Sequence, residues 1–275
     1  MSTSGTFDAA ASTFESYRSL PPGVPEAIRT VIWDALDLAS PVRVLEIGAG
    51  TGRIGKAFVG AGDFYVGVDT SLTMLRHFPA NSKDCILIHA DGRQLPFCDD
   101  VFDLVLLMQV LSGTADWQGI LNETRRVLLP GGSVVVGHTV RPQSGVDAQL
   151  KRQLKAILER MNVVRHRSHE SRKEALAWLR SSAVRYMHSE AASWQVNASA
   201  QDFLVRHRTG ARFAALPAAV QEQALKQLAD WAEMTFGSLD AGFQEKRSFE
   251  LDIFQLAEGA GRNSIRPSDE KHYRR

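Results

Sequence analysis

The residues of this chain best suited to chemistry stand in one short segment, residues 44–52, where an acid and alternating glycines interrupt an apolar run. The segment reads Val-Leu-Glu-Ile-Gly-Ala-Gly-Thr-Gly, with Glu46 two residues before Gly48 and with Gly50 and Gly52 completing the alternation. Glycine has no Cβ, so the backbone can turn tightly here and a ligand can lie directly against it. Apolar residues resume at helical spacing after the glycines. The sequence therefore predicts a strand, a nucleotide-binding turn and a helix.

Two classes of ligand fit this turn. Gly50 to Gly55 matches the G-x-G-x-x-G pattern of dinucleotide-binding loops, with Asp69 as the ribose ligand. Glu46, however, completes the pattern E-x-G-x-G-x-G, which resembles the first motif of class I methyltransferases that depend on S-adenosyl-L-methionine (SAM). A dinucleotide loop keeps its helix N-terminus open to a pyrophosphate, whereas SAM carries no phosphate and presents a cationic sulfonium and ammonium. A carboxylate beside the loop favours SAM.

Later segments follow in the order and spacing of that family. Two further apolar runs each end in an acid, a third leads to Gln109, and a Pro-Gly-Gly turn leads into another apolar run. These segments are residues 64–69, 85–93, 102–109 and 127–136. The chain thus resembles the ubiquinone-type and other small-molecule members of the class I methyltransferases.

The resemblance implies a fold and a set of cofactor contacts. It implies an α/β fold with a seven-stranded, Rossmann-like sheet in the order 3-2-1-4-5-7-6, with strand 7 antiparallel and a helical cap. In such enzymes the acid after the second strand binds both ribose hydroxyls, which assigns this role to Asp69. The acid after the third strand meets the exocyclic amine of adenine, which assigns it to Asp91. The expected cofactor-binding residues are Glu46, Gly48, Ala49, Gly50, Gly52, Asp69, Thr70, Met74, Asp91, Gly92 and Gln109.

Methyl transfer from a sulfonium is an in-line displacement, so the enzyme's main task is to position the acceptor and exclude water. A hydroxyl or phenol acceptor would benefit from a base, and His138, at the end of the expected fifth strand, is the candidate. The alternative is that His138 only fills a polar rim. Ser112 and Gly113 stand where many family members have a histidine pair, so the role of that pair cannot be transferred to this chain.

The chain is expected to fold as one methyltransferase domain, residues 25–258. Between the expected sixth strand, residues 184–196, and the seventh, residues 247–256, lies an insert over residues 198–240. Its apolar residues recur at helical spacing up to Gly237, which is placed to end a helix. We expect the insert to fold over the carboxyl ends of the strands and to define the substrate.

The two ends of the chain have different compositions. Residues 1–24 are expected to form a lid, because Tyr17 and Arg18, followed by prolines, are similar to the segment that folds over SAM in ubiquinone-type enzymes. The alternative is a surface helix with an aromatic side chain packed under it. Residues 259–275 are polar and basic without periodicity, which predicts a disordered tail.

Two local patterns predict helix starts in the second half of the chain. Asp116 is placed to cap a helix that ends before a Pro-Gly-Gly turn. Ser171 and Glu174 have the spacing of a capping box, which predicts that another helix begins at Ser171.

Composition limits the classes of partner. The 275 residues include 32 basic and 31 acidic side chains, a formal charge of +1, so no overall field attracts nucleic acid or anionic membranes. Cys85 and Cys98 have neither the spacing of a redox pair nor the partners of a metal site, and no metal is expected. Without a signal-peptide pattern or a long apolar run, we expect a cytoplasmic protein with no membrane span.

These observations favour a SAM-dependent methyltransferase that acts on a small molecule. A SAM-binding accessory or regulatory protein without transfer activity is the first alternative. An NAD-dependent oxidoreductase is the second, and Glu46 and Asp91 argue against it.

Overall fold

A computed structural model describes most of the chain. The described residues are 19–39, 41–79, 83–112, 114, 116–163, 168–208, 213 and 216–257. The expectations for Tyr17, Arg18, Gly113 and the tail at 259–275 lie outside these ranges.

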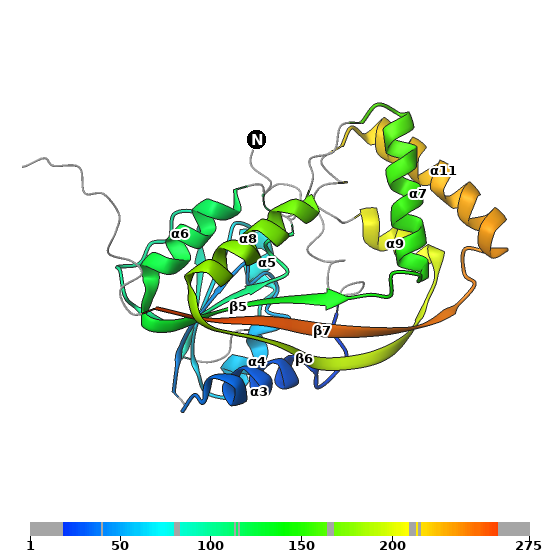
Figure 1. The fold of residues 1–275 in the computed structure, drawn as a ribbon. Coiled ribbons are helices and arrows are strands. Elements are labelled where there is room, and N and C mark those ends of the chain that lie inside the picture. Colours follow the sequence, from blue (N-terminus) through cyan, green and yellow to red (C-terminus); the bar gives the residue numbers. More distant parts are fainter. Residues whose placement is uncertain are drawn as a thin grey trace, which may run out of the picture.

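One seven-stranded sheet organises the described residues (Figure 1). Its strands are β1 (Arg43–Ile47), β2 (Phe64–Asp69), β3 (Cys85–His89), β4 (Phe102–Met108), β5 (Leu128–Val140), β6 (Ala183–Ala198) and β7 (Phe243–Leu256). The order is β3-β2-β1-β4-β5-β7-β6, and β7 runs antiparallel to both neighbours. This confirms the order 3-2-1-4-5-7-6 with an antiparallel strand 7. The usual dinucleotide-binding order is 3-2-1-4-5-6, without such a strand, so the topology disfavours the oxidoreductase.

Helices cover both faces of the sheet. They are α3 (Val24–Leu36), α4 (Gly55–Gly60), α5 (Leu72–Arg76), α6 (Trp117–Val127), α7 (Val146–Arg160), α8 (Ser168–Ser182), α9 (Ala200–Arg208) and α11 (Ala218–Phe236). In Figure 1, α6 and α8 lie on one side of the sheet and α3 and α4 on the other. Among the described residues, no helix combines the length and apolar character needed to cross a membrane.

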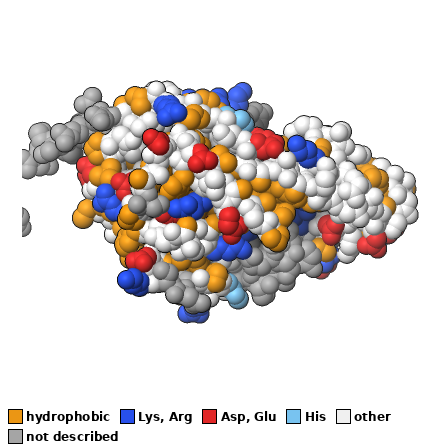
Figure 2. All heavy atoms as spheres, turned by 90° about the horizontal axis from the view of Figure 1, so that it is seen from below, with side chains coloured by type: hydrophobic (Ala, Val, Ile, Leu, Met, Phe, Trp, Pro, Cys, Tyr) orange, Lys and Arg blue, Asp and Glu red, His pale blue; other side chains and the backbone are white. Residues whose placement is uncertain are grey.

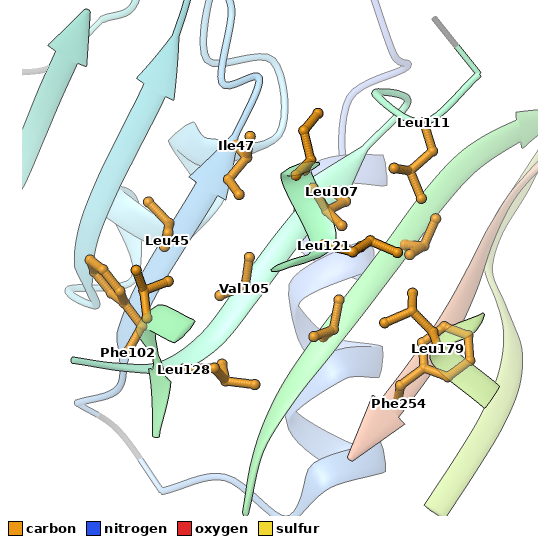
Figure 3. Close-up of a cluster of buried hydrophobic side chains, with 14 of the residues drawn as sticks. Leu45, Ile47, Phe102, Val105, Leu107, Leu111, Leu121, Leu128, Leu179 and Phe254 are labelled. Carbon is orange, nitrogen blue, oxygen red and sulfur yellow. The ribbon is translucent and has the colours of Figure 1, made fainter. Parts of the chain in front are cut away.

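The alternation of side chains along the strands produces one core on each face of the sheet. Leu45 and Ile47 face the α6 and α8 side, where Figure 3 shows them in one cluster with Leu121, Leu179 and Phe254. Val44 belongs to the core on the α3 and α4 side. Each large side chain that is fully buried in this way stabilises the fold by about 1.5–3 kcal/mol. The two cores fix the carboxyl ends of β1 and β2, where the glycine turn begins.

The insert contains helices α9 and α11, and it builds a third core together with α7. Helices α7, α9 and α11 contribute Leu154, Phe203 and Leu228 to one buried cluster. Strands β6 and β7 are longer than the sequence indicated and pair along their length from Ala183 opposite Leu256 to Ala198 opposite Phe243. They extend beyond the rest of the sheet toward this helical group (Figure 1). The apolar side of the insert therefore has α7 as its partner.

The helix boundaries test the local patterns. The side chain of Asp116 accepts a hydrogen bond from the amide of Gly119 at 3.0 Å, which confirms the cap of α6. Gly237 ends α11 in the left-handed conformation, with φ of 81°. The predicted start at Ser171 is wrong, because α8 begins at Ser168. Glu174 instead lies inside the helix and accepts a hydrogen bond from the indole of Trp117 at 3.4 Å.

The surface agrees with the balanced composition. On the face shown in Figure 2, acidic and basic side chains are interspersed with apolar ones, without a broad patch of one sign. A cluster of His, Cys, Asp or Glu side chains able to hold a metal ion is absent from the part of the chain that the structure describes. Positively charged side chains gather instead along the wall of a cavity that begins beside the glycine turn.

Candidate cofactor and acceptor site

The glycine turn contains one open position. Gly48, Gly50 and Gly52 have φ of 80°, 56° and 78°, which side chains rarely adopt. A Cβ on Gly48 would lie 2.5 Å from the side chain of Val110, and a Cβ on Gly52 would lie 2.6 Å from the ring of Phe78. For a Cβ on Gly50, the nearest heavy atom of the described residues beyond its chain neighbours is 3.9 Å away, in the Asp69 carboxylate. Gly48 and Gly52 thus permit close packing, whereas Gly50 leaves space for a ligand.

Asp69, at the end of β2, borders this space and organises the turn. Its Oδ2 accepts a hydrogen bond from the backbone amide of Gly50 at 2.9 Å, and its Oδ1 accepts one from the backbone amide of Ser71 at 2.8 Å. Burial raises the pKa of Asp69, against these hydrogen bonds, which lower it. A carboxylate offers about four acceptor positions, so Asp69 retains capacity to accept a hydrogen bond from a ligand hydroxyl.

Asp91, after β3, is more exposed and already has a partner. Arg93 donates to its carboxylate from Nη2 at 2.6 Å and from Nε at 3.0 Å. The hydrogen bond from Arg93 lowers the pKa of Asp91. An adenine amine would therefore share this carboxylate with Arg93.

Three smaller candidates adjoin the two acids. Thr70 is half-buried, and its carbonyl oxygen lies 3.0 Å from Nε2 of His89. Met74 is buried in α5, where its amide donates to the Ser71 hydroxyl. A Cβ on Gly92 would lie 2.6 Å from the Ile47 side chain, so this glycine is required for packing.

Glu46 lies beneath the turn rather than beside the open space. Its side chain is buried, and it accepts a hydrogen bond from the hydroxyl of Tyr65 at 2.5 Å. Burial raises the pKa of Glu46 from 4.5 to about 7, although the Tyr65 hydrogen bond and the charge of Arg53 lower it. Ala49 is likewise buried. The role of Glu46 as a direct cofactor ligand stays a prediction, and the geometry favours a role in shaping the turn.

Glu46→Gln should change how stability depends on pH. Because the pKa of the folded form lies above that of the unfolded chain, Glu46 contributes stability that is fully present below about pH 4.5 and is lost as the pH rises through about 7. We expect urea unfolding to show the parent losing roughly 2–3 kcal/mol relative to Glu46→Gln between about pH 5 and about pH 8. Glu123→Gln removes a carboxyl whose pKa is lowered, so it serves as the control. Parallel pH profiles of Glu46→Gln and the parent would contradict the burial argument.

Gln109 lies between the end of β4 and the cavity described below. It follows β4 with φ of 62°, a strained conformation for a residue other than glycine. Its backbone amide donates to the carbonyl of Gly137 at 2.8 Å, and its side-chain amide donates to the hydroxyl of Thr139 at 3.1 Å. The strained backbone is held by β5, and Gln109 lines the cavity described next.

A cavity of about 490 Å³ extends from the glycine turn to the helical group. Gln109 and Arg53 line its end near the turn, and Phe203 of α9 lines its other end. Residues 19–22, at the end of the expected lid, also line it. The insert and the segment before α3 therefore border the same space.

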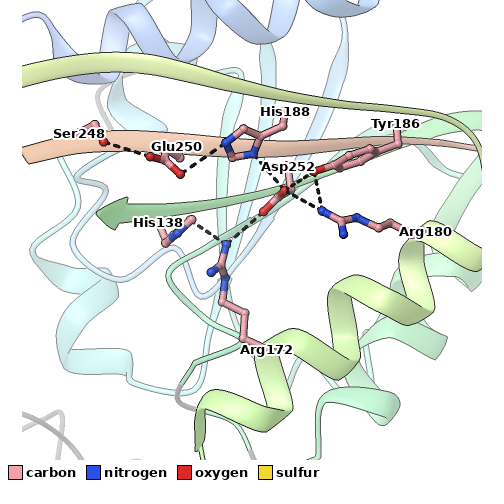
Figure 4. Close-up of polar contacts among 8 residues, drawn as sticks. All are labelled: His138, Arg172, Arg180, Tyr186, His188, Ser248, Glu250 and Asp252. Atoms are coloured by element: carbon pink, nitrogen blue, oxygen red, sulfur yellow. Dashed lines mark hydrogen bonds and ion pairs between the residues drawn. The ribbon is translucent and has the colours of Figure 1, made fainter. Parts of the chain in front are cut away.

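His138 lies apart from this cavity, in a polar network between β5, β6, β7 and α8 (Figure 4). Its Nδ1 accepts a hydrogen bond from Arg172 at 2.9 Å, and Arg172 also donates to Asp252 at 3.0 Å. The hydroxyl of Tyr186 donates to the same carboxylate at 2.8 Å, and Nδ1 of His188 lies 3.2 Å from it. Figure 4 shows these side chains converging on Asp252.

The network makes His138 a weak base. Burial, followed by the charge of Arg172, lowers its pKa to about 4. A general base works best when its pKa is near the operating pH. The assignment of catalysis to His138 stays a prediction, and neither its position nor its pKa favours it.

Sequence reasoning missed the residues that give the cavity its charge. Asp147 of α7 is buried, and both of its oxygens accept hydrogen bonds from Arg206 of α9 at 2.6 Å. The Nε of Arg141 lies 2.8 Å from the same carboxylate, and Arg247 of β7 lies 3.9 Å from it. Arg206 and Arg247 are far from Asp147 in the sequence, and no local pattern connects the four residues.

Comparisons with known proteins agree with this geometry. Residues 45–136 match the family model described as a methyltransferase domain. A demethylmenaquinone methyltransferase of Corynebacterium urealyticum is 37% identical over 107 residues, which cover 39% of this chain and 46% of that protein. The chain spans about half the length of the curated relatives it matches.

Solved structures show the same fold at low sequence identity. A protein of Anabaena variabilis, described as a putative methyltransferase from an antibiotic biosynthesis pathway, has a TM-score of 0.56 and 17% identity, covering 83% of this chain and 96% of that one. Phosphoethanolamine N-methyltransferase 2 of Haemonchus contortus, solved with SAM, has a TM-score of 0.55 and 14% identity, covering 94% of this chain and 60% of that one. Residues 45–136 thus carry a methyltransferase domain, and the described residues have the fold of the class I SAM-dependent methyltransferases.

Proposed function

We propose that this protein is a SAM-dependent methyltransferase that acts on a small molecule. The observation that carries the proposal is the open space above Gly50, which borders Asp69 and lies at the carboxyl ends of β1 and β2. Doubly wound sheets bind their ligands at this edge. The adjoining cavity supplies room for an acceptor next to the cofactor.

The residues around this space fit SAM. The remaining acceptor capacity of Asp69 suits the ribose hydroxyls, and Asp91 suits the adenine amine. Gln109 and Arg53, which line the cavity beside the turn, suit the methionine end, where a guanidinium can pair with the carboxylate. When bound, SAM supplies an electrophilic methyl group whose leaving group is a neutral thioether.

The protein's own contribution is position and the exclusion of water. Residues 19–22 and Phe203 border the cavity from opposite segments of the chain, which supports a shared cover over the acceptor formed by the N-terminal segment and the insert. In this proposal, residues 1–24 form the N-terminal part of the cover and residues 198–240 form the insert. Cys85 and Cys98 are free thiols, which supports a reducing compartment such as the cytoplasm.

Asp69→Ala should weaken SAM binding by about tenfold or more, because a charge-assisted hydrogen bond to a ribose hydroxyl contributes about 1.5–3 kcal/mol. Asp91→Ala is the matched comparison at the next strand. Its carboxylate is exposed and shared with Arg93, so we expect a loss of only about threefold. Isothermal titration calorimetry with SAM measures both, and thermal unfolding checks that each variant folds. Equal losses, or a larger loss at Asp91, would contradict the assignment of Asp69 to the ribose.

An accessory protein that binds SAM without transferring the methyl group is the alternative, because His138, the base expected from the sequence, lies outside the cavity and has a lowered pKa. Incubation with methyl-labelled SAM and a panel of small-molecule acceptors separates the two functions. Transfer of label to an acceptor supports the enzyme. Tight SAM binding with no transfer to any acceptor supports the accessory role.

A further inference from the structure

The wall of the cavity farther from the glycine turn carries an excess of positive charge. Arg141, Lys151, Arg206 and Arg247 line this part of the cavity, and among its described lining residues Asp147 is the one carboxylate. The nearby Glu245 is buried and does not line the cavity; it accepts a hydrogen bond from the amide of Val146 on Oε1 and one from Arg247 on Oε2 at 3.4 Å. Four cations therefore line the same space as one anion, and Glu245 pairs with Arg247 from behind the wall.

Asp147 holds the arginines in place without neutralising them. It accepts two hydrogen bonds from Arg206 and lies 2.8 Å from the Nε of Arg141. Burial alone would raise the pKa of Asp147, yet the charges of Arg206 and Arg141 lower it below its ordinary value. Asp147 thus stays ionised, and one negative charge organises several guanidinium groups around the cavity.

Lys151 and Arg247 each keep a hydrogen-bond donor that has no acceptor among the described residues. Lys151 lies one helical turn after Asp147 on α7, and the structure gives it no ion pair within the described residues. Lys151 is exposed at the mouth of the cavity, and desolvation by the surrounding wall, followed by the charge of Arg141, lowers its pKa. The Nε of Arg247 is buried and has no hydrogen-bond acceptor among the described residues. Both side chains can therefore donate to an anion in the cavity.

The rest of the lining is apolar. Trp194 and Val196 of β6, Phe203 of α9 and Leu20 before α3 line the same cavity. An aromatic or apolar body can pack against these side chains while an attached anion faces the cations. A wholly neutral ligand would leave the cations without compensation in a partly desolvated space.

We propose that the acceptor is an anionic small molecule, whose carboxylate or phosphate is bound by Lys151, Arg141 and Arg247 and whose apolar body packs against Trp194 and Phe203. The name acceptor rests on the proposed function, whereas the anion site itself does not. The arrangement sets the anion at the far end of the cavity and directs the rest of the molecule toward Gln109 and the glycine turn.

Ligand-observed NMR tests the site with simple probes on the full chain saturated with S-adenosylhomocysteine (SAH). The probes are 4-fluorobenzoate, its neutral amide 4-fluorobenzamide, and inorganic phosphate, detected by ¹⁹F and ³¹P line broadening. We expect 4-fluorobenzoate, phosphate or both to bind, and the amide to bind at least about fivefold more weakly than the bound anion. Binding of 4-fluorobenzoate alone identifies a carboxylate site, and binding of phosphate alone identifies a phosphate site.

Lys151→Gln should weaken binding of that anion by at least about fivefold, while its SAH affinity stays that of the parent. Lys155→Gln is the matched control, because Lys155 lies one turn further along α7, is exposed like Lys151, and pairs with Glu159 outside the cavity. The proposal is overturned if neither anion binds, if the amide binds as well as the anions, or if Lys151→Gln and Lys155→Gln behave alike. Failure of the parent to bind SAH would instead reject the proposed function and leave the anion site to be judged by the probes.

Discussion

Gly50→Ala is expected to reduce SAM and SAH affinity about a hundredfold, equivalent to about 2.7 kcal/mol, while the protein still folds. Gly50 has φ of 56°, and the space beside its Cα is open except for Asp69. A methyl group there would occupy the position that we assign to the cofactor. The left-handed backbone adds a cost of about 1–2 kcal/mol to folding. Isothermal titration calorimetry and urea unfolding measure the two effects separately.

Gly62→Ala is the matched control for that experiment. Gly62 also has a positive φ, of 82°, and apart from its chain neighbours no atom of the described residues lies within 4 Å of a Cβ placed there. Both variants should lose a similar amount of stability, since both place a side chain in the left-handed region. Gly62→Ala should bind SAH as the parent does. If Gly50→Ala also binds SAH normally, the open space above Gly50 is not the cofactor position.

Asp147→Asn should lower the free energy of unfolding by about 3–5 kcal/mol, more than any other substitution proposed here. It removes the buried charge that holds Arg141 and Arg206. The pKa of Asp147 is lowered on folding, so its contribution is fully present above about pH 4 and is lost as the pH falls further. Urea unfolding at neutral pH measures the loss. Asp103→Asn breaks the exposed pair with Arg43 and should cost less than about 1 kcal/mol.

Asp147 and Asp103 differ in how much of the side chain is exposed to solvent. Asp147 is 2% exposed at its side chain, whereas Asp103 is 36% exposed. Equal destabilisation by both substitutions would mean that the arginines around Asp147 find other partners. Greater stability of Asp147→Asn than of the parent would contradict the view that this carboxylate organises the cavity wall.

The sheet could be predicted from the sequence because its signals are local. Apolar runs that end in Asp69 and Asp91 lie within single strands or directly after them, and the resemblance supplied their order. The same holds for Asp116, which caps α6 through the amide three residues later. The start of α8 was mispredicted because Ser171 and Glu174 have the spacing of a capping box, yet the helix already begins at Ser168.

The site could be predicted only where its residues belong to such local motifs. The burial of Glu46 depends on Tyr65, which reaches it from the neighbouring strand. Asp147 and Arg206 are 59 residues apart and meet only because α7 and α9 pack together. The interaction of His138 with Arg172 likewise depends on how α8 lies on the sheet. These contacts arise from packing, which the spacing of residues along the chain does not encode.

The most direct test of the account is a calorimetric titration of the purified full chain with SAH and, separately, with NAD, each repeated on Gly50→Ala. We expect SAH to bind the parent with one site per chain, Gly50→Ala to lose about a hundredfold in SAH affinity, and NAD to give no measurable heat of binding with either protein. Tight binding of NAD to the parent, or no binding of SAH to it, would contradict the assignment of the glycine turn to SAM.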